Sequence, residues 1–257
     1  MVRCFRSAIF FLWPLLFFVP SASAQKRVFA TVNPNAAALN SDGDIYDPGT
    51  GAVVPTSGKL NAAREQFVAV LMNGGKVFIA GGYDNRYLKT AEVFNPATGT
   101  FAAVADDMID ARGGAVATLL QGGGVLIAGG YNGEYVSTAE IFDPTTETFT
   151  ATNPMSVARQ NATAIRMSGG KVLIAGGFNG AFLNSAEIYD SASGSFDFSD
   201  AVMSNPREWH AATLLSDGRV LITGGCNNSN SGEVKCDDFL DSAEIYDPSS
   251  DSFSDAG

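Results

Sequence analysis

Few residues in this chain could support acid–base or metal chemistry, because its 257 residues include a single histidine, His210. One histidine excludes metal centres built from several imidazoles, and a nucleophile–histidine–carboxylate triad would have to use His210 itself. Trp209 stands directly before it, so the two form one candidate pocket. A structural, hydrogen-bonded His210 is the interpretation we favour. We therefore expect no catalytic residue set, no metal and no cofactor.

Residues 1–24 have the three parts of a secretory signal peptide. Arg3 and Arg6 give a basic start, an apolar run follows at residues 9–19, and residues 22–24 supply the small residues of a cleavage site. A transmembrane anchor is the alternative, but the run is shorter than the ~20 residues that a bilayer core requires. No later stretch is apolar enough to span a membrane. The sequence therefore predicts a secreted or periplasmic protein without a membrane span after cleavage.

Export bears on the three cysteines, because Cys4 lies in the predicted signal peptide and only Cys226 and Cys236 remain in the mature chain. In an oxidising compartment such a pair predicts a disulfide. Closing so short a loop contributes on the order of 2–3 kcal/mol. A metal-binding pair is the weaker alternative, since no further Cys or His lies nearby in sequence, and a free thiol pair is weaker still.

The chain is acidic, with a formal net charge of −11. Removal of the predicted signal peptide takes away two Arg and no Asp or Glu, which makes the mature charge −13. Binding to nucleic acid needs clustered Lys and Arg against the phosphates. We therefore expect no nucleic-acid partner.

Columns of residues recur along the chain with a period of 47 or 48 residues. A glycine pair ends each of four apolar runs, an Arg recurs in the same steps, and a Glu follows each glycine pair. The last Glu spacing is 57 residues, because the fourth copy contains the segment between the two cysteines. A functional ring of charges is conceivable, but a residue needed in every copy usually builds the repeat, so we expect these Arg and Glu side chains to be buried and hydrogen-bonded to one another. The columns are Gly81-Gly82, Gly129-Gly130, Gly176-Gly177 and Gly224-Gly225; Arg64, Arg112, Arg159 and Arg207; and Glu92, Glu140, Glu187 and Glu244.

Each repeat predicts four short strands. A small apolar strand and a turn come first, followed by a fully apolar run that is too short for a helix and ends in glycine, which indicates a buried strand. The third strand carries the Glu, and the fourth begins at a Phe. Four strands per ~40–50 residues predict the blade of an all-β propeller. A solenoid is the competing architecture, but its repeats of this length are usually helical, and no segment has a helical period.

The order of these columns resembles the kelch repeat: a glycine pair, then Ala-Glu-Ile-Tyr-Asp-Pro as at residues 243–248, then an aromatic residue, then Met and Arg. The resemblance covers about residues 44–257 and implies a kelch-type β-propeller. The dipeptides typical of WD40 blades are absent. Two columns depart from the family but keep an aromatic ring, so we expect the same packing: Phe replaces the usual Trp at Phe101, Phe149, Phe196 and Phe253, and the usual Tyr at Phe94 and Phe142.

We expect a lead-in at residues 25–43, a half blade at 44–57 and four full blades at about 62–107, 110–154, 157–202 and 205–257. The half blade is in register with the repeats, because Asp44 precedes Glu92 by 48 residues. Kelch-like rings are often closed by a blade shared between the two termini, and no later residues supply inner strands here. We therefore expect an incomplete ring, as in a fragment of a longer propeller; an open arc with unpaired edges is the alternative.

The loops after the glycine pairs are the candidate binding surface, because binding residues concentrate on loops held by a rigid scaffold. An aromatic residue stands five positions before each repeat Glu. Packing onto the next blade is the interpretation we favour for these rings, although aromatic rings beside polar groups also suit sugars and protein surfaces. The candidate ligand-binding residues are Tyr87, Tyr135, Phe182, Phe239, Asn85, Arg86, Asn132, Glu134, Asn179, Trp209 and His210.

Two functions remain. Repetition without a nucleophile–base or metal constellation favours an exported, non-catalytic propeller that binds a protein or glycan through its loops. The alternative is a carbohydrate-active enzyme of the exported kelch-like type, mutarotase-like or oxidase-related, with a central pocket near Trp209 and His210. The resemblance gives no matching active-site residue for the mutarotases, and a galactose-oxidase site would need two His ligands and a cross-linked Cys–Tyr pair.

Overall fold

The computed structural model describes residues 41–47, 50–227, 236 and 238–256, and in addition the backbone of two short strands, β1 (Phe17–Phe18) and β2 (Arg27–Phe29). Every regular element in this part of the chain is a β-strand. Most of the predicted signal peptide and lead-in lies outside the described residues. Within the described residues, no helix has the length and apolarity that a membrane crossing requires.

Four sheets of four antiparallel strands follow one another along the chain, so the prediction of an all-β propeller with four full blades is confirmed. Within each blade the chain passes from the inner to the outer strand through antiparallel neighbours. A two-stranded hairpin interrupts the fourth blade between its second and third strands. Blade 1 comprises β5 (Val68–Leu71), β6 (Val77–Ala80), β7 (Ala91–Asn95) and β8 (Thr100–Ala103); blade 2 comprises β9 (Val116–Leu119), β10 (Val125–Ala128), β11 (Ala139–Asp143) and β12 (Thr148–Thr152); blade 3 comprises β13 (Thr163–Arg166), β14 (Val172–Ala175), β15 (Ser185–Asp190) and β16 (Ser195–Val202); blade 4 comprises β17 (Ala211–Leu214), β18 (Val220–Thr223), β21 (Ala243–Asp247) and β22 (Ser252–Asp255), with the hairpin β19 (Cys226–Asn227) and β20 (Asp238–Phe239).

A further sheet lies at the N-terminal end and contains β3 (Asp44–Asp47) and β4 (Ala52–Pro55). The sequence predicts only this outer half. In the structure β2 pairs with β3, and β1 pairs with β2, so the sheet has four strands. The backbone of β2, which precedes β3 in the sequence, thereby pairs with an edge of β3 whose N–H and C=O groups would otherwise be unpaired.

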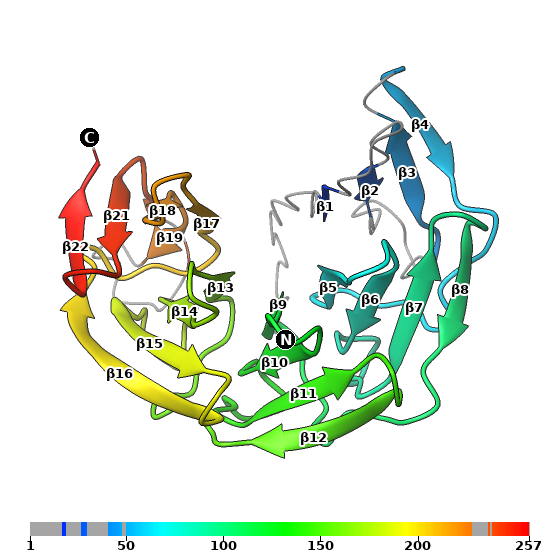
Figure 1. Ribbon diagram of the computed structural model, residues 1–257, viewed down its shortest axis with the longest axis horizontal. Helices are drawn as coiled ribbons and strands as arrows, with labels where there is room; N and C mark the ends of the chain where they lie inside the picture. Colours follow the sequence, from blue (N-terminus) through cyan, green and yellow to red (C-terminus); the bar gives the residue numbers. More distant parts are fainter. Residues whose placement is uncertain are drawn as a thin grey trace, which may run out of the picture.

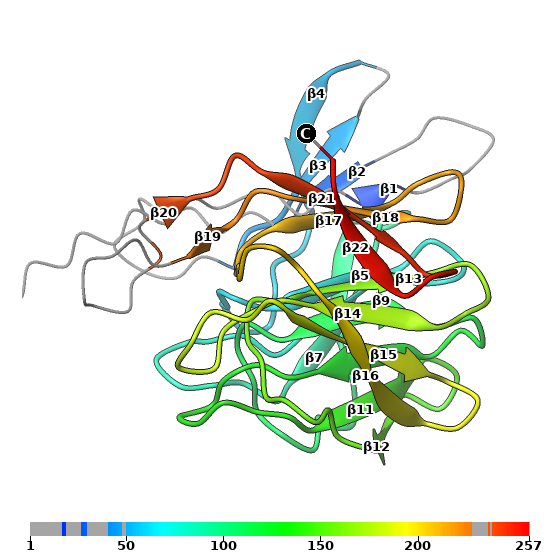
Figure 2. The same ribbon diagram turned by 90° about the vertical axis from the view of Figure 1, so that its left-hand side faces the viewer.

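The sheets are arranged around an arc (Figure 1), with β5, β9, β13 and β17 on the inside and each contacting the next. Seen from the side, the hairpin β19–β20 projects from one side of the arc, at the left in Figure 2. The links that leave β6, β10 and β14 occupy the equivalent place in their blades. We call this side of the molecule the loop face.

Hydrophobic cores lie between neighbouring blades. Phe78 of blade 1 stacks on Phe142 of blade 2 with ring centroids 4.3 Å apart, and Leu126 of blade 2 packs in one cluster with Val172 and Tyr189 of blade 3. The second strands β6, β10 and β14 are therefore buried along their whole length. Both faces of these strands are covered by other blades, which explains why they read as continuous apolar runs.

The phenylalanines that replace the usual tryptophan and tyrosine keep an aromatic packing role. In each blade the ring that opens the fourth strand lies next to the ring of the third strand, with centroids 4.7–5.0 Å apart. The four pairs are Phe94–Phe101, Phe142–Phe149, Tyr189–Phe196 and Tyr246–Phe253.

Candidate functional site

The repeated Arg and Glu side chains are buried and form one ion pair in each blade, as the sequence predicts. The distance between Arg Nη2 and Glu Oε1 is 2.7–3.0 Å in all four copies. The pairs are Arg64–Glu92, Arg112–Glu140, Arg159–Glu187 and Arg207–Glu244.

These pairs hold the blades together. In blade 2, Arg112 Nη1 donates hydrogen bonds to the carbonyls of Gly129 and Thr138 at 2.7 and 2.9 Å. Glu140 Oε2 accepts the backbone N–H of Ile109 at 2.8 Å. The carbonyl of Arg112 accepts the N–H of Gly82, which belongs to blade 1, at 2.8 Å. Because their polar atoms bind backbone groups inside the fold, these side chains offer no free charge to a ligand.

Six aromatic rings form a continuous series on the loop face, which we call the aromatic file. Rings within one loop lie 5.0–5.1 Å apart, and rings of neighbouring loops meet at 5.5 and 5.7 Å in T-shaped contacts. All six rings are half-buried, so each combines packing with an exposed portion. In order along three blades, the file is Tyr83, Tyr87, Tyr131, Tyr135, Phe178 and Phe182.

Half of this file was not among the sequence-based candidates. The three added members, Tyr83, Tyr131 and Phe178, each follow a glycine pair directly. Each forms a β-bridge both to the chain entering its blade and to the second ring of its loop, as in Glu65–Tyr83–Tyr87. The signal that could have revealed them is an aromatic at both ends of a five-residue loop in three copies.

The polar candidate residues lie at the tips of these loops. Each tip is a tight turn, in which Asp84 donates its N–H to the carbonyl of Arg86 at 2.9 Å in the first copy. The turn needs a positive φ, which Asn85 adopts at 53° and Gly133 at 116°; Asn tolerates this conformation better than most side chains. Asn179 is half-buried, and the exposed tip residues are Asn85, Arg86, Asn132 and Glu134.

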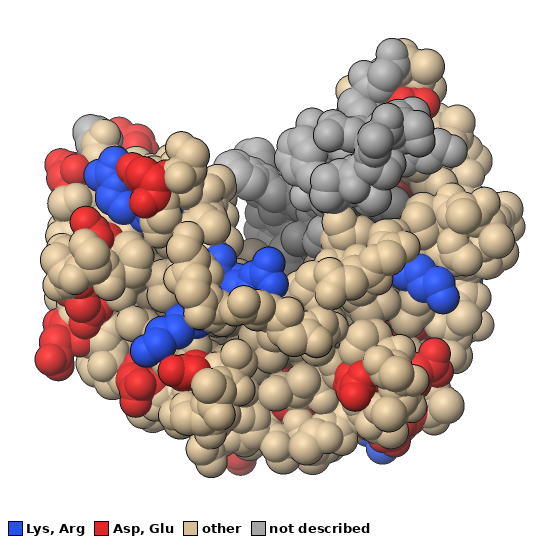
Figure 3. All heavy atoms as spheres, in the orientation of Figure 1, with Lys and Arg blue, Asp and Glu red and all other residues tan. Residues whose placement is uncertain are grey.

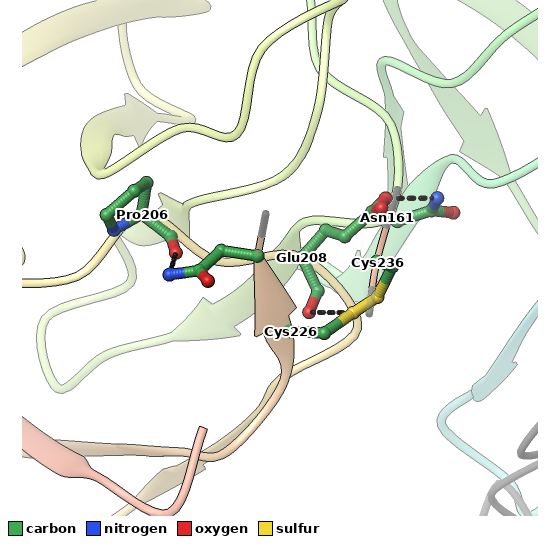
Figure 4. The surroundings of a disulfide bond; sticks show 6 residues. Asn161, Pro206, Glu208, Cys226 and Cys236 are labelled. Atoms are coloured by element: carbon green, nitrogen blue, oxygen red, sulfur yellow. Dashed lines mark hydrogen bonds between the residues drawn. A yellow bond between two sulfur atoms is a disulfide. The ribbon is translucent and has the colours of Figure 1, made fainter. Parts of the chain in front are cut away.

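In the fourth blade a disulfide takes the place of the first loop ring (Figure 4). Cys226 exchanges backbone hydrogen bonds with Glu208 at 3.0 and 3.1 Å, as Tyr83 does with Glu65 in the first blade. The predicted bridge from Cys226 to Cys236 is present. Phe239 pairs with Cys226 across β19–β20 and is 66% exposed.

His210 is buried between blades 3 and 4. Its ring lies against Gly176 so closely that a Cβ atom on this glycine would stand 2.7 Å from Cε1. Nε2 lies 2.9 Å from Thr163 Oγ1, and Nδ1 has no hydrogen-bond partner among the described residues. Burial lowers the pKa of His210 to about 3, and the nearby Arg207 cation acts in the same direction. The imidazole is therefore neutral at physiological pH, whereas Trp209 beside it is 48% exposed.

Two further columns follow the repeat Arg, and of their members only Trp209 was singled out from the sequence. The first column contains Glu65, Gly113, Gln160 and Glu208. The second of them has positive φ throughout: Gln66, Gly114, Asn161 and Trp209 have φ between 54° and 63°. Backbone N–H groups donate from blade to blade along this column, at 2.8 Å from Gly114 to Gln66, 2.8 Å from Asn161 to Gly114 and 3.1 Å from Trp209 to Asn161. Gly114 and Asn161, at the same offset after Arg112 and Arg159, were the available signal, since both residue types favour this conformation.

Glu208 belongs to the first of these columns and is 7% exposed. Its Oε2 accepts a hydrogen bond from Asn161 Nδ2 at 2.8 Å (Figure 4). Burial raises the pKa of this carboxyl, and the Asn161 bond opposes the shift. Burial also raises the pKa of the Tyr135 hydroxyl, with contributions from Tyr131 and from the charge of Glu208.

A carboxylate oxygen of Glu208 lies within 4.8 Å of the Sγ atoms of both Cys226 and Cys236. Such a trio could hold a metal only if the sulfurs were thiolates, because the thiolate is the ligand form of cysteine. In the disulfide form these residues make no metal site.

The side of the molecule opposite the loop face carries a shallow hollow that contains neither Trp209 nor His210. The hollow is lined by Ser168, Ser216, Asp217, Gly218, Arg219, Asp247, Pro248 and Ser249.

On the face shown in Figure 3, basic side chains of the described residues are separated by uncharged and acidic ones. This arrangement lacks the continuous basic surface that phosphate backbones require.

Comparison with protein families gives a match to the Kelch motif in four segments, residues 67–108, 113–156, 163–198 and 210–257. Each segment corresponds to one blade, and together they span well over half of the chain. A comparison with curated proteins gives no match.

Proposed function

The chain belongs to the kelch-repeat family, and from this premise we propose that it is an exported, non-catalytic propeller that binds a protein through its loop face. Kelch propellers commonly serve as protein-binding modules. The proposed ligand is an extracellular or envelope protein, and a glycan is the second ligand class that the same surface could take.

The aromatic file is the observation that carries this proposal. Its six rings contact one another in series across three blades, on loops whose backbones are tied to the blade entry by β-bridges. Aromatic side chains contribute large contact areas and dominate binding energy at many interfaces. Because the loops are held rigidly, little conformational entropy is lost when a partner binds.

Export is supported by the signal-peptide pattern of residues 1–24 and by the disulfide, which forms readily in oxidising compartments. We expect cleavage after Ala24, with a mature chain that begins at Gln25; cleavage there would remove β1 and leave β2, β3 and β4 in the N-terminal sheet. Mass spectrometry of the exported protein tests this. An intact N-terminus on protein recovered from outside the cytoplasm would contradict it.

The binding proposal is tested with immobilised mature protein and an envelope or culture extract. The double variant Tyr87→Ser/Tyr135→Ser should lose the proteins that the wild type retains. Phe198→Ser is the matched control, because this ring is 50% exposed on β16, away from the loop face. Equal retention by all three proteins would contradict a role of the loop face, and blank results with both the extract and a glycan array would contradict binding altogether.

The enzymatic alternative receives less support. A catalytic His210 would need access to substrate, whereas this side chain is 6% exposed, and its lowered pKa makes it a weak base. The hollow on the side opposite the loop face is lined by other residues.

A further inference from the structure

We propose that the loop face contains a cation-binding subsite, formed by Glu208, Asn161 and Tyr135, that receives the guanidinium group of an arginine side chain. This inference rests on the proposed protein-binding function and names the chemistry that the partner presents. None of these three residues belongs to the Arg–Glu pairs that hold the blades together.

Glu208 differs from every other buried glutamate in the described part of the chain. Five glutamates are buried there, and four of them have an Arg partner in the same blade. Glu208 has no cationic partner among the described residues; its one side-chain hydrogen bond comes from Asn161. Burying a carboxylate without a compensating charge costs free energy. A cation supplied by a partner would provide the missing counter-charge.

The three residues come from three different blades. Tyr135 belongs to blade 2, Asn161 precedes the inner strand of blade 3, and Glu208 precedes that of blade 4. The amide of Asn161 donates a hydrogen bond to Oε2 of Glu208 at 2.8 Å, and the charge of Glu208 contributes to the raised pKa of the Tyr135 hydroxyl. Asn161 and Glu208 both precede inner strands, which lie on the inside of the arc where the blades approach one another.

One carboxylate oxygen is left for a ligand. Glu208 Oε1 has no hydrogen-bond partner among the described residues, and it is not among their fully buried unpaired atoms. Tyr135 is half-buried, and Trp209, which follows Glu208 directly in the chain, is 48% exposed, so both can offer aromatic surface to a ligand. The subsite thus combines an anchored carboxylate with aromatic rings.

An arginine side chain matches this combination better than a lysine. Its guanidinium group is planar, donates several hydrogen bonds, stacks on aromatic rings and is weakly hydrated, so less hydration is lost on burial. Lysine presents a compact, strongly hydrated charge. The net negative charge, −11 for the whole chain and −13 without the predicted signal peptide, also favours the approach of a basic partner.

The test uses three acetylated and amidated pentapeptides, Gly-Ser-X-Ser-Gly, in which X is arginine, lysine or citrulline. Citrulline keeps the shape of arginine and removes its charge. Binding is followed by calorimetry and by the fluorescence of Trp209, the only tryptophan outside the predicted signal peptide. We expect the arginine peptide to bind at least tenfold more tightly than the other two.

The matched variants are Glu208→Gln and Glu147→Gln. Both remove one negative charge, but Glu147 is exposed on the turn after β11. Glu208→Gln should weaken arginine-peptide binding at least tenfold, whereas Glu147→Gln should leave it unchanged. Glu208→Gln should also melt at the same temperature as the wild type or higher, because an uncompensated buried charge is removed.

Several results overturn the proposal. These are equal binding of the arginine and citrulline peptides, equal binding of the lysine peptide, undiminished binding by Glu208→Gln, or a marked fall in its melting temperature, which would assign Glu208 a structural role. If the double variant Tyr87→Ser/Tyr135→Ser loses partner capture but peptide binding does not depend on Glu208, the protein-binding function is retained and the subsite is rejected. Glu208-dependent peptide binding without any captured partner would retain the subsite and reject the function.

Discussion

Acidification should destabilise this fold through His210, the single histidine of the chain. Its pKa is about 3 in the folded protein and about 6.5 in an unfolded chain. The unfolded state therefore binds more protons between these values, so the contribution to stability is complete above pH 6.5 and is lost as the pH falls towards 3. At about 1.4 kcal/mol per pH unit, the full loss is about 5 kcal/mol, of which about 2 kcal/mol falls between pH 7 and pH 5.

The assay is urea unfolding at half-unit steps from pH 5 to pH 7, with His210→Gln as the partner variant. Glutamine is neutral and can still hydrogen-bond to Thr163, and the variant contains no histidine. The difference in unfolding free energy between the two proteins isolates the imidazole, since all other groups are shared. Glu208, whose pKa is raised by burial, acts with the opposite sign and cancels in this difference.

The wild type should lose about 2 kcal/mol more than His210→Gln between pH 7 and pH 5. Parallel pH profiles for the two proteins would refute the reasoning, because they would mean that His210 accepts a proton in the folded state as readily as in the unfolded chain.

Three further predictions concern the repeat and its insertion. Arg112→Ala should lower stability by about 3–5 kcal/mol, because its carboxylate partner would remain buried without a counter-charge; thermal unfolding should show a fall on the order of 10 °C, and an unchanged melting temperature would contradict the structural role. Gly129→Ala should be more destabilising than Gly74→Ala in urea unfolding: both glycines have positive φ, but a Cβ at Gly129 would collide with a backbone carbonyl of blade 3, whereas the space at Gly74 is open. Replacing both Cys226 and Cys236 with Ser should cost about 2–3 kcal/mol under oxidising conditions and nothing in a reductant, and equal losses in both conditions would contradict this origin.

The blade architecture could be predicted because each blade repeats one local pattern. The apolar runs β6, β10 and β14 are buried on both faces, and the glycine pairs, Arg and Glu recur because every blade needs the same backbone contacts. Repetition converts a long-range packing requirement into a visible period along the chain. The two inner strands β1 and β2 were not predictable in this way, because they do not belong to the repeat.

The candidate binding surface was only partly predictable. The second ring of each loop was visible from its offset to the repeat Glu, yet the contacts that join Tyr87 to Tyr131 and Tyr135 to Phe178 connect different blades. Glu208 was missed because it belongs to a column of varied residue types. Its distinguishing property, burial without a counter-charge, is not a property of its sequence neighbours.

The sequence by itself determined the blade chemistry, the number of full repeats and the disulfide pair, because these depend on residue types at fixed spacing. Only the tertiary structure decided that His210 is buried and neutral, and that Glu208 is buried without a counter-charge and hydrogen-bonded to Asn161. Burial and electrostatic environment depend on which blades surround a side chain. Asn161 and Glu208, 47 residues apart in the chain, meet because the inner strands of blades 3 and 4 lie side by side, and this proximity cannot be read from the sequence around either residue.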